Sequence, residues 1–216
     1  MEHDKEYFRK RLKESQKQYD QSNESSRIKK QNTAQLMADK VKSENLVSLV
    51  PGCEFLFFYG SNSVFSQWFK CEFQVEGTEF TCAEQYMMYK KALLFSDRKA
   101  ANAIIEAGYD PMKHKKIGRT ILGFTAEVWD QEKKDIVYEG NFQKFTQNLG
   151  LKRDLMDTYP KILVEASPSD PIWGIGLSIS DPRKLNPDNW KGQNLLGFIL
   201  TRLRENLQKS QNIIER

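Results

Sequence analysis

Histidine and cysteine are scarce in this chain of 216 residues, which contains two histidines and three cysteines. It has neither a Cys-x-x-Cys spacing nor a cluster of Cys and His, so we expect no zinc site and no other metal or cofactor. A Ser/His/Asp triad is disfavoured because His3 lies almost at the start of the chain, leaving only His114. Three cysteines do not form a disulfide framework, and their odd number is typical of a reducing compartment.

Long apolar runs are also missing. No stretch approaches the roughly 20 residues that span a bilayer, and the N-terminus lacks the apolar core of a signal peptide. We therefore expect an intracellular protein, cytoplasmic or nuclear, with no membrane partner. P-loop, Rossmann, Gly-x-Ser-x-Gly and kinase signatures are absent from the sequence.

The small excess of positive charge is unevenly distributed. Residues 1–45 hold 11 basic and 8 acidic side chains, whereas the remainder holds 22 and 21. The first segment is polar and predicts a mobile or loosely helical tail, because it offers few apolar residues to bury. We expect one domain over residues 46–210 and a short C-terminal tail over 211–216. A nearly neutral domain gives no support for a long nucleic-acid groove.

Local patterns predict an α+β domain that is rich in helix and has few short strands. The apolar run 54–60 predicts a buried strand, residues 71–80 a hairpin, and residues 162–166 another strand. Helices are expected over 82–95, 97–107, 111–119, 126–145 with an interruption near Gly140, 152–158 and 194–207.

An acid and an amine share one face of the helix predicted over 82–95. Glu84 and Lys91 are seven residues apart, so they point in nearly the same direction, with Met87 and Met88 between them. A charge pair on an apolar stripe indicates the floor of a pocket. The structural alternative is a capping box, in which Thr81 is the N-cap and Glu84 closes the helix start.

The loop 167–176 is the second candidate. Asp170 lies between two prolines and is a candidate base or ribose ligand, while Trp173 is a candidate for stacking on a base. The alternative is that Asp170 fixes a turn and Trp173 anchors the core.

Other residues offer contacts to a ligand, each with a structural alternative. Ser66 and Gln67 follow a Gly-Ser turn and offer hydrogen bonds, Arg119 offers a planar fork to phosphate, and Asn194 is either a ligand contact or the N-cap of the last helix. Trp129 is explained as well by the core as by a ligand.

Six motifs occur in a fixed order, and together they are specific. They are Phe65-Ser66-Gln67-Trp68, Ala83-Glu84-Gln85-Tyr86-Met87-Met88 with Lys91, Val128-Trp129 before Ile136-Val137-Tyr138-Glu139-Gly140-Asn141, Leu163-Val164-Glu165-Ala166-Ser167-Pro168 with Asp170, Ile172-Trp173-Gly174-Ile175-Gly176-Leu177, and Trp190-Lys191-Gly192-Gln193-Asn194-Leu195-Leu196-Gly197. Over residues 55–207 the chain resembles the YbiA-like, or NADAR, family of N-glycosidases.

The resemblance implies a YbiA-like fold and hydrolysis of an N-glycosidic bond between ribose and a nucleobase-like group. Two substrate classes are implied: the aminouracil ribose phosphates of early riboflavin synthesis, and ADP-ribose attached to guanine, with ADP-ribosylated DNA as the corresponding partner. A module that binds ADP-ribose or another nucleotide without turnover is the alternative.

The resemblance also implies roles for individual residues. The catalytic Glu and Lys of the family fall on Glu84 and Lys91, and its functional Trp and Asp on Trp129 and Asp170. Within the matched motifs we expect substrate contacts from the following residues: Ser66, Gln67, Tyr86, Trp129, Trp173, Gly174 and Asn194. Outside these motifs we expect one further contact, from Arg119. The chain departs from the family at Tyr89-Lys90, which places a second lysine beside Lys91.

Two mechanisms fit these assignments. In one, Glu84 and Asp170 act as a carboxyl pair around an oxocarbenium-like transition state. In the other, which we prefer, neutral Lys91 forms a Schiff base with the opened sugar and Glu84 moves protons.

Overall fold

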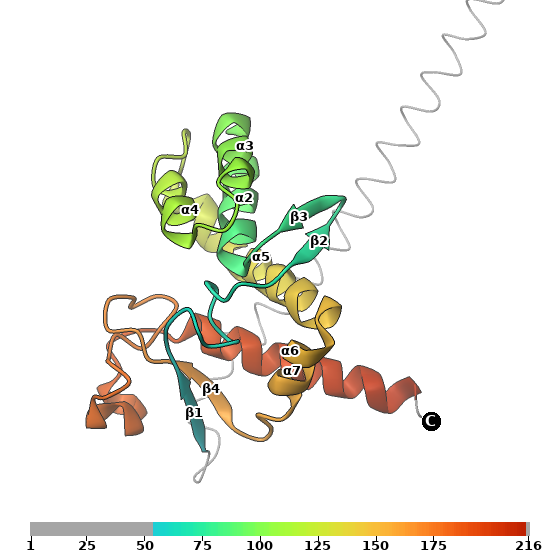
Figure 1. Cartoon of the computed structure of the whole chain (residues 1–216). Helices are drawn as coiled ribbons and strands as arrows, with labels where there is room; N and C mark the ends of the chain where they lie inside the picture. Colours follow the sequence, from blue (N-terminus) through green and yellow to red (C-terminus); the bar gives the residue numbers. More distant parts are fainter. Residues whose placement is uncertain (1–53, 215–216) are drawn as a thin grey trace, which may run out of the picture. The chain divides into compact units, whose positions relative to one another are not determined.

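A computed structural model of the chain describes residues 54–214, and within them the side chains of residues 54–210. The tail predicted over 1–45 lies outside the described residues. The described part is a helix-rich domain with two small sheets, which confirms the predicted fold class (Figure 1).

Each sheet has two strands. β1 (Phe55–Phe58) pairs in parallel with β4 (Ile162–Glu165), so that Phe58 lies opposite Glu165 at the carboxyl ends of both strands. β2 (Phe73–Val75) and β3 (Thr78–Phe80) form the predicted hairpin. Its turn residues Glu76 and Gly77 both have positive φ, which is the geometry of a two-residue hairpin loop.

The helix α2 (Ala83–Leu94) packs against three other helices, α3 (Arg98–Glu106), α4 (Pro111–Gly118) and α5 (Ala126–Gln147). Figure 1 shows α2, α3 and α4 grouped on one side of the domain, above the β1–β4 pair. The short α6 (Leu149–Met156) follows α5, and α7 (Leu195–Ile214) packs against β4 and α5. Two short 3-10 helices, η1 (Pro182–Leu185) and η2 (Pro187–Asn189), precede α7.

The prediction that α5 breaks near Gly140 is wrong. The helix continues through this residue because Gly140 lies directly against the ring of Tyr86 on α2. A Cβ at position 140 would be 2.5 Å from Cδ1 of Tyr86, so the glycine allows the two helices to approach. An isolated glycine is tolerated inside a helix when packing requires it.

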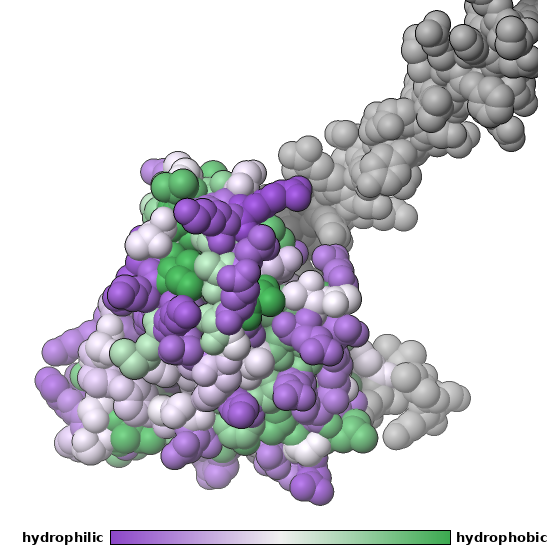
Figure 2. Space-filling view, turned by 45° about the horizontal axis from the view of Figure 1, so that its top comes forward, coloured by the Kyte–Doolittle hydropathy of each residue, from purple (hydrophilic) through white to green (hydrophobic). Residues whose placement is uncertain are grey.

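The last helix is longer than predicted. It begins at Leu195 and runs past Leu207 to Ile214, so residues 211–214 belong to α7 rather than to a tail. Its apolar side chains Leu196, Leu200 and Leu203 are completely buried in the core. Hydrophilic side chains cover most of the face of the domain seen in Figure 2, with apolar side chains between them. No helix among residues 54–214 is long and apolar enough to cross a membrane.

Candidate functional site

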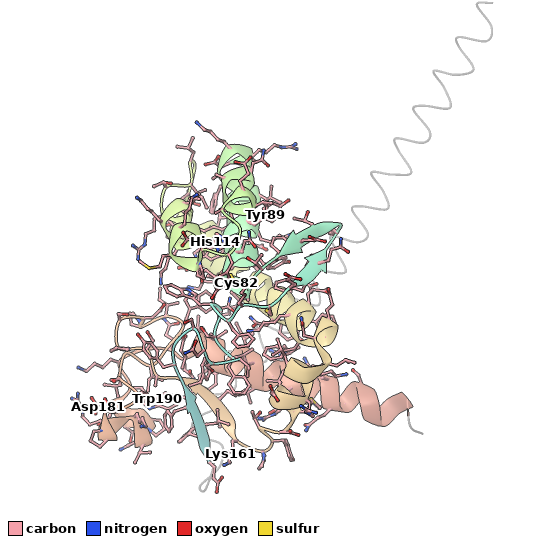
Figure 3. All side chains as sticks on the ribbon, viewed as in Figure 1. Cys82, Tyr89, His114, Lys161, Asp181 and Trp190 are labelled. Atoms are coloured by element: carbon pink, nitrogen blue, oxygen red, sulfur yellow. The ribbon has the colours of Figure 1, made fainter. Side chains whose placement is uncertain are left out.

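The start of α2 determines what Glu84 is free to do. The N-cap is Cys82 and not Thr81, and Gln85 rather than Glu84 reaches back to close the turn. Gln85 Oε1 accepts hydrogen bonds from the Thr81 backbone N–H at 2.8 Å and from its hydroxyl at 2.9 Å. The capping interpretation of Glu84 is therefore wrong, because the helix starts one residue later than the Thr-x-x-Glu pattern predicts. Figure 3 labels Cys82 at this helix start, with His114 of α4 nearby.

Glu84 is a buried carboxyl with incomplete hydrogen bonding. Its side chain is almost fully buried, and among the described residues Oε1 has no hydrogen-bond partner. Its backbone N–H donates to the carbonyl of Gln67 at 2.9 Å, which fixes the first turn of the helix against the 66–68 segment. Burial raises the pKa of Glu84 to about 7, against the opposing charge of Lys115 and a hydrogen bond from the Trp68 side chain. Near neutral pH this carboxyl both gives and accepts a proton readily.

A second carboxyl, Glu165, shares this environment, and the sequence patterns did not identify it. It is the last residue of β4, and its Oε2 is buried without a hydrogen-bond partner in the described part of the chain. Burial raises its pKa to about 8, with further increases from Asp170 and Glu84 and a decrease from Lys115. The signal available in the sequence was an ionisable residue at the end of a buried apolar strand, since the carboxyl ends of parallel strands are frequent binding sites.

Asp170 acts on both glutamates but is engaged by the backbone. Its Oδ1 accepts hydrogen bonds from the N–H groups of Ile172 at 3.1 Å and Trp173 at 2.9 Å. Its Oδ2 is 4.0 Å from Nζ of Lys115 on α4. The turn-fixing interpretation of Asp170 is therefore confirmed, and its charge also raises the pKa of Glu84 and Glu165.

Lys91 lies further along α2, between a carbonyl and two aromatic rings. Its Nζ donates to the carbonyl of Gly118 at 2.8 Å and is 4.2 Å from the ring centroid of Phe124 and 5.4 Å from that of Trp129. Burial lowers the pKa of Lys91, and the charge of Glu84 opposes this shift. The aromatic faces add attraction for the protonated form. Trp129 therefore lies next to Lys91, as expected if both belong to one site.

The hydrogen bond between Lys91 and the carbonyl of Gly118 depends on the absence of a side chain at position 118. A Cβ there would lie 2.0 Å from Sδ of Met88, so α4 approaches α2 closely only without a side chain at this position. The close approach brings the last carbonyls of α4 to Lys91, and the negative end of the helix dipole lies there as well.

The 66–68 segment is held from the side of α5. Nζ of Lys144, completely buried, donates to the carbonyl of Ser66 at 2.8 Å, and Nδ2 of Asn141 donates to Oε1 of Gln67 at 2.8 Å. Burial lowers the pKa of Lys144 to about 8. These contacts position Trp68 against Glu84, so the geometry gives Ser66 and Gln67 a supporting function in the fold.

Asn194 supports β4. It is completely buried, its Oδ1 accepts from the N–H of Glu165 at 2.9 Å, and its Nδ2 donates to the carbonyl of Leu163 at 3.0 Å. Both polar atoms of its amide thus bind backbone, and it is not the side-chain cap of α7. Its φ of 51° is one that asparagine tolerates better than most residues.

The remaining expected contacts are dispersed. Tyr86 is buried in the core, where it packs against Phe73 and Phe80. Arg119 is exposed at the C-terminal end of α4. Trp173 is half-buried, and Gly174 lies so close to β4 that a Cβ would be 2.8 Å from the carbonyl oxygen of Glu165. The structure therefore corrects Tyr86 from a substrate contact to a core residue.

The residues that come together are two carboxyls with raised pKa values, a third carboxylate, and two lysines. Such a set suits proton transfer to and from a bound group and nucleophilic attack by an amine. Among residues 54–214 no group of three or more His, Cys, Asp or Glu side chains is arranged to hold a metal ion.

Comparison with known proteins shows that the chain matches a protein family. The sequence profile of the NADAR domain matches residues 57–208. The chain is 42% identical to "N-glycosidase R617" of Acanthamoeba polyphaga mimivirus in an alignment of 167 residues that covers 72% of this chain and 98% of that protein. It is 30% identical to "N-glycosidase YbiA" of Escherichia coli strain K12, over 69% of this chain and 82% of that protein.

The chain is also similar to one further relative and to one solved structure. "Protein irg-1" of Caenorhabditis elegans is 40% identical over 73% of this chain and 81% of its own length. The solved NMR structure of E. coli YbiA superposes with a TM-score of 0.61 at 27% identity, covering 75% of this chain and 89% of that one.

Proposed function

The chain belongs to the NADAR family of YbiA-like proteins, and on this basis we propose that it is an N-glycosidase that hydrolyses the bond between a ribose and a nucleobase-like group. The observation that carries the proposal is the buried Glu84 carboxyl, whose pKa of about 7 suits proton exchange at neutral pH. Lys91 on the same helix supplies an amine whose pKa is lowered by burial.

The lysine route uses these two groups in sequence. The sugar ring first opens: the bond between C1′ and the ring oxygen breaks, the oxygen takes a proton from Glu84, and an iminium forms between C1′ and the nitrogen of the base. Neutral Lys91 then adds to C1′ through Nζ, which loses a proton to the Glu84 carboxylate, so that Glu84 is protonated again. The bond from C1′ to the base nitrogen breaks as that nitrogen takes a proton from Glu84, which leaves a Schiff base on Lys91.

Water completes the cycle. It adds to C1′ of the Schiff base and gives up its protons to a carboxylate and to the departing lysine nitrogen. The sugar leaves as a free aldehyde that closes to ribose, and Lys91 is neutral again. The net reaction consumes one water and yields the base and the ribose.

For the substrate we propose a ribose that carries phosphate, on a riboflavin-type aminouracil or as ADP-ribose on guanine. Lys115 of α4 is one of the charged residues grouped with Glu84 and Glu165. Arg119, one helical turn further along, is exposed on the same face of α4, with Lys116 beside it. Cations on one face of a helix favour an anionic group near the carboxyls, where Arg119 offers a planar fork to phosphate oxygens.

The test is to incubate the purified protein separately with a ribosylaminouracil phosphate and with ADP-ribosylated guanine DNA. Products are followed by mass spectrometry beside Glu84→Gln. Release of the base from the first, lost in the variant, supports a metabolite hydrolase; release of ADP-ribose from the second supports a nucleic-acid repair enzyme. Tight nucleotide binding without product release would refute the proposed hydrolase and indicate a binding module.

A further inference from the structure

Glu165 and Glu84 each have one buried carboxyl oxygen that accepts no hydrogen bond from the described part of the chain. Asp170 differs from them in this respect, because it is bound by two backbone N–H groups and faces Lys115. Glu84 and Glu165 each keep one buried oxygen without a partner among residues 54–214. A buried, unpartnered carboxyl oxygen is costly, so two of them in one environment indicate a group that is completed by a ligand.

The backbone of Glu165 is fixed from three directions. Its N–H donates to Oδ1 of Asn194, its carbonyl accepts from the N–H of Ile175 at 2.9 Å, and the strand pairs in parallel with β1 opposite Phe58. The side chain of Glu165 therefore extends from a strand end whose backbone is held rigidly. A catalytic group needs such support, because its reach to the reacting atoms is set by the backbone that carries it.

Glu165 and Glu84 come from different elements but share their charged neighbours. Lys115 of α4 and Asp170 of the loop after β4 act on both carboxyls, and Glu84 acts on Glu165. Lys91, on the same helix as Glu84, acts on Glu84 alone of the two. Two interacting carboxyls of this kind titrate as a pair and retain a proton near neutral pH.

We propose that Glu165 is a second catalytic carboxyl, which forms with Glu84 a proton-exchanging pair that faces the glycosidic bond. This inference rests on the proposed N-glycosidase function and replaces the Glu84–Asp170 pair expected from the sequence. The protonated member of the pair gives its proton to the leaving nitrogen, and the ionised member takes a proton from the attacking water. The pair ends the cycle with the number of protons it held at the start.

Asp170 and Lys115 act on the pair as positioning residues. Asp170 holds the 170–173 turn next to β4, and its negative charge keeps a proton on the glutamates, whereas Lys115 limits that effect. Neither needs to touch the substrate for this role.

The experiment compares Glu165→Gln with Glu79→Gln, a matched control because Glu79 is an exposed strand glutamate on β3. We expect Glu165→Gln to lower kcat by about 10²–10⁴-fold and to remove one limb of the pH profile, while Glu79→Gln leaves both unchanged. A Glu165→Gln variant that folds and keeps the wild-type kcat and pH profile would overturn the proposal.

A second measurement does not depend on turnover or on that variant. The side-chain carboxyl of Glu165, labelled with ¹³C and assigned by correlation to its backbone, is titrated by NMR in the wild type and in Glu84→Gln. We expect a midpoint near neutral pH that moves to lower pH in Glu84→Gln, because a like charge is removed. A midpoint of an ordinary glutamate, unaffected by Glu84, would refute the pair even if the wild type hydrolyses both substrates. Wild-type inactivity together with the expected titration would refute the hydrolase and leave the pair standing.

Discussion

At the level of single residues, the site is defined by groups whose burial opposes their charge. Glu84 and Glu165 are carboxyls with raised pKa values, and Lys91 is an amine with a lowered one. Burial dominates each of these shifts, and neighbouring charges adjust them. Perturbed groups of opposite type in one place are typical of a catalytic site, because burial moves the pKa of each group towards neutral pH.

Replacing Lys91 by Arg tests the nucleophile. Arginine preserves the positive charge and hydrogen bonds but does not form a Schiff base, so we expect turnover to be abolished. Borohydride added during turnover should attach the sugar to Lys91 in the wild type and to nothing in Lys91→Arg; Lys90→Arg is the control, because it alters the neighbouring lysine. Trapping in Lys91→Arg, or no adduct on Lys91 in an active wild type, would exclude the lysine route.

Lys115→Gln tests the charge that acts on both glutamates. Lys115 lowers the pKa of Glu84 and of Glu165, so its removal should raise both. The limb of the pH–rate profile that reports the carboxyl pair is expected to move to higher pH by about 0.5–1 unit. Lys113→Gln is the matched control, because Lys113 is exposed on the same helix. Equal profiles for the two variants would contradict the assignment.

At the level of helices and strands, glycines determine how closely α2 approaches its neighbours. Gly118 allows α4 to pack on Met88, and Gly140 allows α5 to pack on Tyr86. The helix that carries Glu84 and Lys91 is therefore fixed on two sides by positions without a side chain.

Gly140→Ala tests this packing. The added methyl group would lie 2.5 Å from the Tyr86 ring, so we expect the free energy of unfolding to fall by about 1–3 kcal/mol in urea denaturation. Gly150→Ala is the control: Gly150 also lies in a helix, but a Cβ there would meet nothing within 4 Å, so alanine should be neutral or stabilising by up to about 1 kcal/mol. Equal effects would show that helix propensity, not the Tyr86 contact, decides the cost.

At the level of the whole domain, the raised carboxyl pKa values make stability depend on pH. An unfolded glutamate has a pKa of about 4.3, whereas Glu84 and Glu165 have values of about 7 and about 8 in the fold. Between these limits the two carboxyls hold more protons in the folded protein than in the unfolded chain, so their contribution to stability falls as pH rises from about 4.3 to 8. Lys144, with a pKa lowered to about 8, acts in the opposite sense above that pH, where the unfolded chain holds the extra proton.

The double variant Glu84→Gln/Glu165→Gln should therefore flatten this slope. We expect it to unfold at a higher temperature than the wild type at pH 8 and to differ less from it at pH 5. At pH 8 the folded wild type loses stability because its buried carboxyls must either ionise or keep a proton, and glutamine removes this cost. Thermal unfolding followed by circular dichroism at both pH values measures the change. A parallel pH dependence in the two proteins would show that these carboxyls do not control stability.

Removing residues 1–45 tests the domain boundary proposed from composition. The family profile begins at residue 57, so we expect the shortened chain to keep kcat/KM for the substrate of the full chain. Loss of kcat/KM with an unchanged melting temperature would assign part of the binding function to the first segment.

The fold class, the hairpin, most helices and the position of Glu84 and Lys91 on one helix could be predicted from the sequence, because they follow from local periodicity and from motifs that are short along the chain. The same patterns offered for Glu84, as an alternative, a capping function that belongs to Gln85, and one of the two mechanisms considered paired Glu84 with Asp170. The position of Glu165 in the environment of Glu84, and the supporting roles of Tyr86 and Asn194, became visible only in the folded domain. The physical reason is that burial and charge proximity join residue 84, residue 115 and the 165–170 segment, which are far apart in the chain and are brought together by packing alone.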